Sequence, residues 1–107
     1  MRIETRSEGQ TTIVEVKDRR IDARNAGALK DAIAPLVTGG AEWLQLDLSD
    51  VELVDSTGLG AIVACLKLLG GKGELAIANA RGPVREYFAT TRMDRVFRMV
   101  ETPGADT

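Results

Sequence analysis

The chain has 107 residues, a length that holds one small domain with a single core. Its 44% hydrophobic and 28% charged residues form an ordinary globular composition, which excludes an intrinsically disordered chain. The net charge of −2 leaves no basic footprint for nucleic acid, and a chain with no histidine and one cysteine excludes histidine-based catalysis, a cysteine zinc site and an internal disulfide.

The spacing of apolar residues predicts an opening hairpin and then strands that alternate with helices. Alternating, β-branched stretches on both sides of the turn signal Glu8-Gly9-Gln10 indicate the hairpin, and Asp22 or Asn25 is the candidate N-cap of the first helix. The expected elements are strands at 3–6 and 12–16, a helix ending at 38–40, a strand at 43–48, a short apolar piece at 51–54, a helix at 56–69, a strand at 74–78, a helix from Gly82-Pro83, and a short turn with a final strand within 93–100.

Proline and glycine mark the ends of these elements. Pro35 falls late in the first helix and should kink or end its last turn, while Gly39-Gly40 and Gly70-Gly71 stand where helices stop. Residues 1–2 and 101–107 are expected to fray. The chain is therefore expected to form one α/β domain over residues 1–107, a mixed sheet with parallel crossovers and helices packed on it.

No segment approaches the roughly 18 apolar residues that a membrane-spanning helix needs, and the first residues lack the apolar core of a signal peptide. We therefore expect no membrane insertion and a cytoplasmic location.

The second helix is apolar on nearly all sides. One stripe is expected to face the sheet, and a second stripe of mostly small residues could be covered by neighbouring helices or by a partner. The first stripe is Leu59, Ile62, Val63, Leu66 and Leu69, and the second is Ala61, Ala64, Cys65 and Leu68. Cys65, inside this helix, is expected to be an inert buried thiol.

The start of this helix is unusual. Ser56 alone could be a routine helix cap, since the first N–H groups of a helix need acceptors. Two glycines then follow in the first turn, Gly58 and Gly60, although glycine in a helix costs up to about 1 kcal/mol relative to alanine. Either the turn packs against backbone or another molecule approaches Ser56 closely.

Charges are unevenly distributed along the chain. Every charge between residues 41 and 66 is negative, and residues 81–98 are mainly basic. Chance clustering on a solvated surface would explain this, and so would an acidic rim around Ser56 that attracts a basic partner. The acidic residues are Glu42, Asp47, Asp50, Glu52 and Asp55.

The run from Val54 to Gly60, Val-Asp-Ser-Thr-Gly-Leu-Gly after an apolar strand, resembles the signature of bacterial anti-sigma factor antagonists, the single-domain STAS family. Ile21-Asp22 resembles the family's loop aspartate, although Arg19 stands where the family often has glycine. The resemblance covers residues 3–100 and implies a STAS-type mixed sheet with Ser56 as the phosphorylation site. It implies a partner-binding face of Asp22, Asp55, Ser56, Thr57, Gly58, Leu59 and Gly60.

The resemblance further implies a phosphorylation-regulated antagonist. Unmodified protein would bind an anti-sigma factor that is a serine/threonine kinase, phosphorylation of Ser56 would end that complex, and a serine phosphatase would reset it. No cofactor, metal, nucleic acid or catalytic residue is expected, so the protein is not expected to be an enzyme.

Two other readings stay open. The first is a constitutive STAS interaction module of a transport or signalling complex without a regulated serine. The second is a small-ligand or nucleotide-binding domain, for which the chain offers few convergent polar groups. A hydrolase ranks last without histidine, and Gly70-Gly71-Lys72-Gly73 lacks the Ser/Thr that follows lysine in a phosphate-binding loop.

Overall fold

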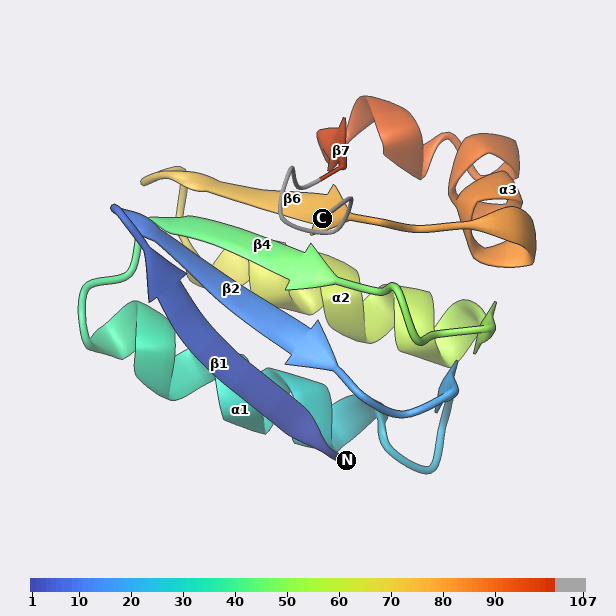
Figure 1. The fold of residues 1–107 in the computed structure, drawn as a ribbon, viewed down its shortest axis with the longest axis horizontal. Coiled ribbons are helices and arrows are strands. Elements are labelled where there is room, and N and C mark those ends of the chain that lie inside the picture. Colours follow the sequence, from blue (N-terminus) through green and yellow to red (C-terminus); the bar gives the residue numbers. More distant parts are fainter. Residues whose placement is uncertain (102–107) are drawn as a thin grey trace.

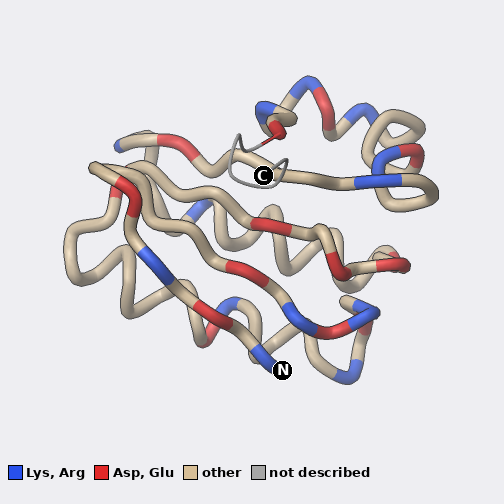
Figure 2. The backbone as a smooth tube through the Cα atoms, viewed as in Figure 1, with Lys and Arg blue, Asp and Glu red and all other residues tan. Residues whose placement is uncertain are grey.

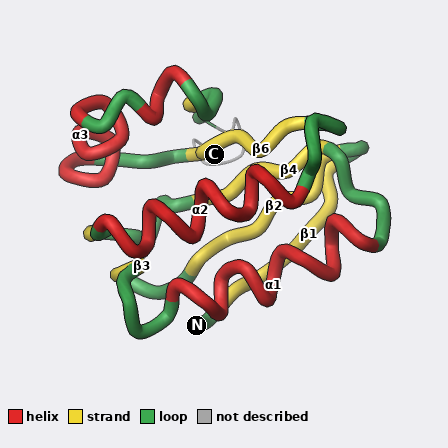
Figure 3. Tube along the Cα trace, turned by 180° about the vertical axis from the view of Figure 1, so that it is seen from behind, coloured by secondary structure: helices red, strands yellow, loops and turns green. Residues whose placement is uncertain are grey.

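A five-stranded sheet with two helices side by side on one face forms the body of the computed structural model, which describes residues 1–101 (Figures 1 and 3). The elements are β1 (Ile3–Glu8), β2 (Thr11–Val16), β3 (Arg20–Ile21), α1 (Ala26–Thr38), β4 (Trp43–Asp47), β5 (Leu53–Val54), α2 (Ser56–Leu68), β6 (Glu74–Ala78), α3 (Gly82–Thr90), a 3₁₀ turn (Met93–Arg95) and β7 (Met99–Val100). The strand order is β1-β2-β4-β6-β7, with β1 antiparallel to β2 and the other neighbours parallel. The predicted fold class is confirmed.

The opening hairpin is also confirmed. β1 and β2 pair with Glu8 opposite Thr11, so that Gly9 and Gln10 alone form the turn. Gly9 has a φ of +63°, a left-handed conformation that glycine adopts at little cost and that suits tight hairpins.

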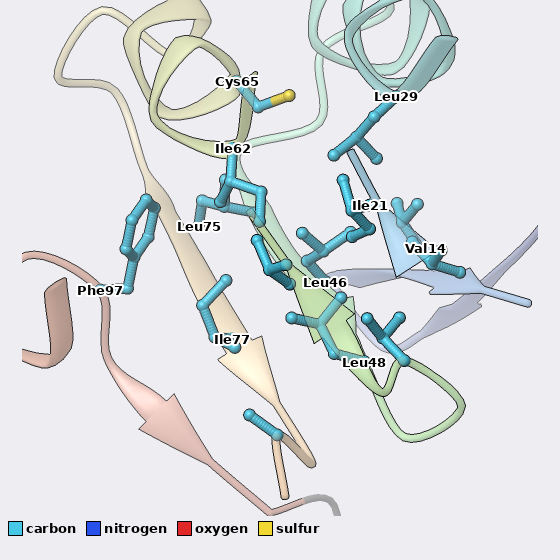
Figure 4. Close-up of a cluster of buried hydrophobic side chains, with 14 of the residues drawn as sticks. Val14, Ile21, Leu29, Leu46, Leu48, Ile62, Cys65, Leu75, Ile77 and Phe97 are labelled. Atoms are coloured by element: carbon cyan, nitrogen blue, oxygen red, sulfur yellow. The ribbon is translucent and has the colours of Figure 1, made fainter. Parts of the chain in front are cut away.

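The core lies between the sheet and the two helices. Alternate residues of β2, β4 and β6 point toward α1 and α2, because side chains of a strand alternate between its faces. Figure 4 shows this cluster, with Leu46 and Ile77 from the strands near Ile62 from α2. Burial of these side chains is the main stabilising term of the fold.

Helix α1 begins after Asn25, one of its two predicted N-caps. Asn25 makes no capping hydrogen bond with the helix, and its side chain instead accepts the N–H of Asp22 at 2.9 Å. Pro35 does not end α1, which continues to Thr38. The Gly39 N–H still donates to the Pro35 carbonyl at 2.9 Å.

The short parallel pair of β3 and β5 was not predicted. Arg20 lies opposite Leu53 and Ile21 opposite Val54, outside the main sheet. Ile21 and Val54 are buried, whereas Arg20 and Leu53 are exposed. Two residues are too few for a periodic pattern, so this pairing is visible only in the tertiary structure.

The predicted sheet-facing stripe of α2 is correct at Ile62 and Leu69 and is displaced around the helix at its other three positions. Its buried positions are Gly58, Ile62 and Cys65, followed by Leu69 just after the helix. Leu59, Val63 and Leu66, which were expected to face the sheet, are half-buried on one flank. Cys65, assigned to the second stripe, is fully buried, so the fold itself covers that part of the stripe.

None of the helices within residues 1–101 is long and apolar enough to cross a membrane.

The fraying expected at residues 102–107 lies outside the described part of the chain. Fraying was also expected at residues 1–2, but the backbone of Arg2 is paired. Its N–H donates to the Asp18 carboxylate at 2.7 Å, and its carbonyl accepts the N–H of Lys17 at 2.8 Å.

Candidate functional site

Asp55 determines where helix α2 begins. Its backbone is extended, with φ −94° and ψ −177°, and its Oδ1 accepts the N–H of Gly58 at 2.8 Å. This is the side-chain hydrogen bond of an N-cap, which satisfies one of the donors left free at a helix start. The cap places Ser56 at the first position of α2.

Ser56 and Thr57 are both exposed at this end of α2. No side-chain hydrogen bond engages either hydroxyl within residues 1–101. The free N–H groups and the dipole of a helix start favour an anion at this place. This end of α2 therefore presents two accessible hydroxyls at a place that favours negative charge.

The two glycines of the first turn have different environments. Gly58 is buried, and a Cβ there would overlap the carbonyl oxygen of Ile21, so the first turn packs directly on the β3 backbone. Gly60 is exposed and has no positive φ, and a Cβ added there would have no atom within 4 Å. Residues four apart on a helix share a face, so Gly60 lies on the side of α2 that carries Ser56. The fold explains Gly58 and gives no reason for Gly60.

The parallel pairing of β3 with β5 brings two predicted site residues together. Because Ile21 lies opposite Val54, Asp22 and Asp55 leave the pair at the same end. The Ile21 carbonyl also accepts the N–H of Asp55 at 3.2 Å. The loop aspartate and the start of α2 thus belong to one region of the surface.

Asp22 is engaged mainly in its own loop. Its Oδ1 accepts the N–H of Arg24 at 3.0 Å, and its backbone carbonyl accepts the N–H of Ala26 at 2.8 Å. Its carboxylate also lies 4.0 Å from the Arg24 guanidinium, and its side chain is only 15% exposed. Asp22 therefore shapes the loop at the start of α1 and offers little free charge to a partner.

The acidic rim around Ser56, one of the two explanations left open for the charge pattern, does not include all five acids. Glu42 precedes β4 and so lies at the opposite end of the sheet from Ser56, and Asp47 is buried, where it accepts hydrogen bonds from Asn79 and Ser49. Two of the remaining acids lie near cations, with Asp50 3.4 Å from Lys17 and Glu52 3.9 Å from Arg19, and Asp55 caps α2. Tertiary contacts intersperse basic residues among acids that are contiguous in the sequence, as Figure 2 shows along the loops.

One exposed residue beside the site, Leu53, was missed, and a second, Arg20, is one whose role the sequence left open. Leu53 is 43% exposed, an unusual position for a leucine, and its strand partner Arg20 is exposed as well. The sequence shows residues 51–54 only as a short apolar piece. Only the burial of Val51 and Val54, on either side of Glu52 and Leu53, shows that its middle faces solvent.

Two grooves flank the connection between β2 and β3. One has a volume of about 750 Å³ and lies between the start of β1 and residues 17–25, and the other, of about 780 Å³, lies toward residues 49–52 and 81–83. Lys17 and Arg19 line both grooves, and Ser56 lines neither. Ser56 is accessible on the surface and does not lie at the bottom of either groove.

Within residues 1–101, no three His, Cys, Asp or Glu side chains come together in a way that could hold a metal ion. Burial raises the pKa of the Cys65 thiol from 9.0 to about 11, which agrees with the prediction of an inert thiol.

Known proteins with similar sequences place these features in context. The family model described as "Mlab, STAS domain" matches residues 3–101. The anti-sigma-F factor antagonist RsfB of Mycobacterium tuberculosis is 34% identical over 83 residues, which span 77% of this chain and 67% of that protein. The anti-sigma-B factor antagonist of Bacillus subtilis is 40% identical over 53 residues, so the match spans 50% of this chain and 48% of that relative.

Solved structures of anti-sigma factor antagonists have a similar fold. An anti-sigma factor antagonist from Mycobacterium paratuberculosis superposes with a TM-score of 0.85 at 30% identity, over 97% of this chain and 88% of that one. The unphosphorylated anti-sigma factor antagonist SpoIIAA has a TM-score of 0.79 at 15% identity, over 98% and 91% of the two chains, which shows a shared fold. Each of these four proteins is named as an anti-sigma factor antagonist.

Proposed function

The chain belongs to the STAS-domain family of anti-sigma factor antagonists, and from this membership we propose that it binds a serine/threonine-kinase anti-sigma factor through the surface around Ser56. Binding would release a sigma factor from that kinase. The observation that supports this most directly is the exposed Ser56 hydroxyl, free of internal hydrogen bonds at the first position of α2.

The proposed partner-binding face combines the start of α2 with the neighbouring loop. Asp55 and Gly58 act inside the fold, one as the cap and the other through its packing on Ile21, and together they hold Ser56 and Thr57 at the surface. The complete proposed face is Asp22, Asp55, Ser56, Thr57, Gly58, Leu59 and Gly60, in which Asp22, Asp55 and Gly58 position the others for contact with the partner.

Phosphorylation of Ser56 would end the complex. In this step the Ser56 Oγ bonds to the γ-phosphorus of ATP, the bond to ADP breaks, and the hydroxyl proton passes to a base on the kinase. The phosphate adds about −1.5 to −2 charges. The first N–H groups of α2 can accommodate it within the domain, so the loss should fall on the interface, through repulsion and the cost of desolvation.

A serine phosphatase would restore the unmodified form. In this cycle the protein is a ligand and a substrate, and it carries out no catalysis of its own. The kinase and the phosphatase supply the catalytic groups, in keeping with a chain that has no histidine.

Intact-mass analysis tests the proposal. The protein is incubated with Mg-ATP and each candidate kinase-type anti-sigma factor encoded in the same genome. We expect one added phosphate on the wild type and on Thr57→Ala, and none on Ser56→Ala. Thr57→Ala is the matched control because it removes the adjacent exposed hydroxyl. No phosphate with any candidate kinase would favour the constitutive interaction module.

Binding is measured separately with Ser56→Asp. This change should weaken the kinase complex severely and leave the free energy of unfolding nearly unchanged, because a carboxylate is well tolerated at a helix start. A complex of wild-type affinity would contradict the proposed switch.

A further inference from the structure

We propose that the groove beside the β2–β3 connection binds an acidic segment of the protein partner, with Arg20 as its central contact. This inference rests on the proposed function and deepens it, since it assigns a second contact area next to Ser56. The groove has a volume of about 750 Å³ and lies between the start of β1 and the residues that lead into α1.

Cationic side chains dominate the lining of this groove. They come from three parts of the chain, namely the residue before β1, the β2–β3 connection together with β3, and the loop before α1, and Figure 2 shows basic segments near the N-terminus and along the adjoining loop. They are Arg2, Lys17, Arg19, Arg20 and Arg24.

The two carboxylates in the lining are already occupied. Asp18 accepts the N–H of Arg2 at 2.7 Å and the side-chain N–H of Asn25 at 3.2 Å, and the first of these bonds lowers the pKa of Asp18. Asp22 accepts the N–H of Arg24 at 3.0 Å. Both carboxylates therefore brace the loop and do not neutralise the groove completely.

The cations differ in how far they are neutralised. Lys17 lies 3.0 Å from Glu15, Arg19 lies 3.9 Å from Glu52 and Arg24 lies 4.0 Å from Asp22. Within residues 1–101, the side chains of Arg2 and Arg20 have no carboxylate within 4.0 Å. These two guanidinium groups are free to form bidentate pairs with carboxylates.

The position of Arg20 connects the groove with the Ser56 surface. Arg20 pairs with the exposed Leu53, and the next residue, Ile21, packs on Gly58 in the first turn of α2. A protein docked at Ser56 can therefore reach both an exposed apolar side chain, Leu53, and a guanidinium without a carboxylate partner, Arg20. Interfaces commonly combine an apolar contact with arginine in this way.

The shape of the groove favours a peptide over a small anion. Small-ligand sites enclose most of their ligand, whereas the arginines here stand on an open surface, with Arg19 and Arg24 more than 80% exposed. The cations also line the groove from parts of the chain that are separated in sequence, so several carboxylates of one extended segment can each meet a cation. Such an arrangement matches a chain of carboxylates.

A titration monitored by NMR tests the groove without any kinase. Hexaglutamate is added to the ¹⁵N-labelled protein at low salt, and the amide signals of residues 17–25 are followed. We expect saturable shifts there. The affinity for hexaglutamate should fall about tenfold or more in Arg20→Glu, which reverses the charge. It should also fall in Arg20→Ala, which removes a charge-assisted hydrogen bond. Lys72→Glu is the control, because it reverses a charge just before β6, at the opposite end of α2 from Ser56.

Three results would overturn the proposal: no saturable shift at residues 17–25, equal affinity in Arg20→Glu and wild type, or equal shifts with inorganic phosphate at the same concentration. The last result would identify a small-anion site. The kinase complex gives an independent readout, in which Arg20→Glu should weaken binding and reduce its salt dependence. If the kinase binds wild type and Arg20→Glu equally, the groove does not contact the partner, and the proposed function stands. If the groove binds hexaglutamate but no kinase complex forms, only the proposed function is rejected.

Discussion

The backbone carbonyl of Ile21 lies directly against Gly58, so closely that any side chain at position 58 would overlap it. The same carbonyl accepts the N–H of Asp55 at 3.2 Å. One peptide group of β3 therefore contacts both the cap and the first turn of α2. This contact fixes how α2 approaches β3 and leaves Ser56 on the outside.

Gly58→Ala should destabilise the protein by about 1–3 kcal/mol, the usual cost of overpacking, because the neighbour is backbone and cannot rotate away. Urea unfolding followed by circular dichroism measures this change. Gly27→Ala is the matched control, since Gly27 lies in the first turn of α1, is exposed and has no atom within 4 Å of an added Cβ. Equal stability of Gly58→Ala and wild type would contradict the packing argument.

Gly60→Ala should have the opposite effect on stability. Alanine has the higher helix propensity, so the free energy of unfolding should rise by about 0.5–1 kcal/mol. If the kinase approaches Ser56 across Gly60, the same change should weaken the complex at least severalfold by adding a methyl group to the contact. Unfolding in urea and binding by calorimetry measure the two effects. A stabilised variant with unchanged affinity would show that the partner does not contact Gly60.

Asp55→Ala should cost about 0.5–2 kcal/mol of stability, because the N–H of Gly58 loses its acceptor. Asp55→Asn keeps a side-chain oxygen at the same place and should lose much less. Thermal unfolding of the two variants in parallel gives the comparison. Identical losses in both would mean that the charge of Asp55, and not its capping hydrogen bond, stabilises α2.

The Cys65 thiol predicts a pH dependence at the alkaline side. Its pKa is about 11 in the folded protein against an ordinary 9.0, so the folded state holds the proton that the unfolded state releases first. The stabilisation from the neutral buried thiol is full below pH 9.0 and is lost as the pH rises toward 11. The stability advantage of wild type over Cys65→Ala should therefore shrink across this range, as urea unfolding at a series of pH values would show. A constant difference would contradict the raised pKa.

The main elements could be predicted from the sequence because their patterns are local. β6 has the predicted bounds, and α2 begins at Ser56 as expected, since Asp55 is a strong cap for the residues that follow it. The sheet-facing side of α2 was not predictable in the same way. All its sides are apolar, so the hydrophobic pattern leaves the rotation of the helix undefined, and the contact of Gly58 with Ile21 selects one orientation.

The sequence by itself determined the class of fold, the presence of the hairpin, the start of α2 and the family signature around Ser56, because each depends on residues close together in the chain. Only the tertiary structure decided which charges and apolar groups meet at the surface. It removed Glu42 and Asp47 from the region of Ser56, brought Arg20 there and left Leu53 exposed. The physical reason is that β3 and β5 pair across more than thirty residues, and such long-range pairing depends on the packing of the whole domain and not on any local pattern.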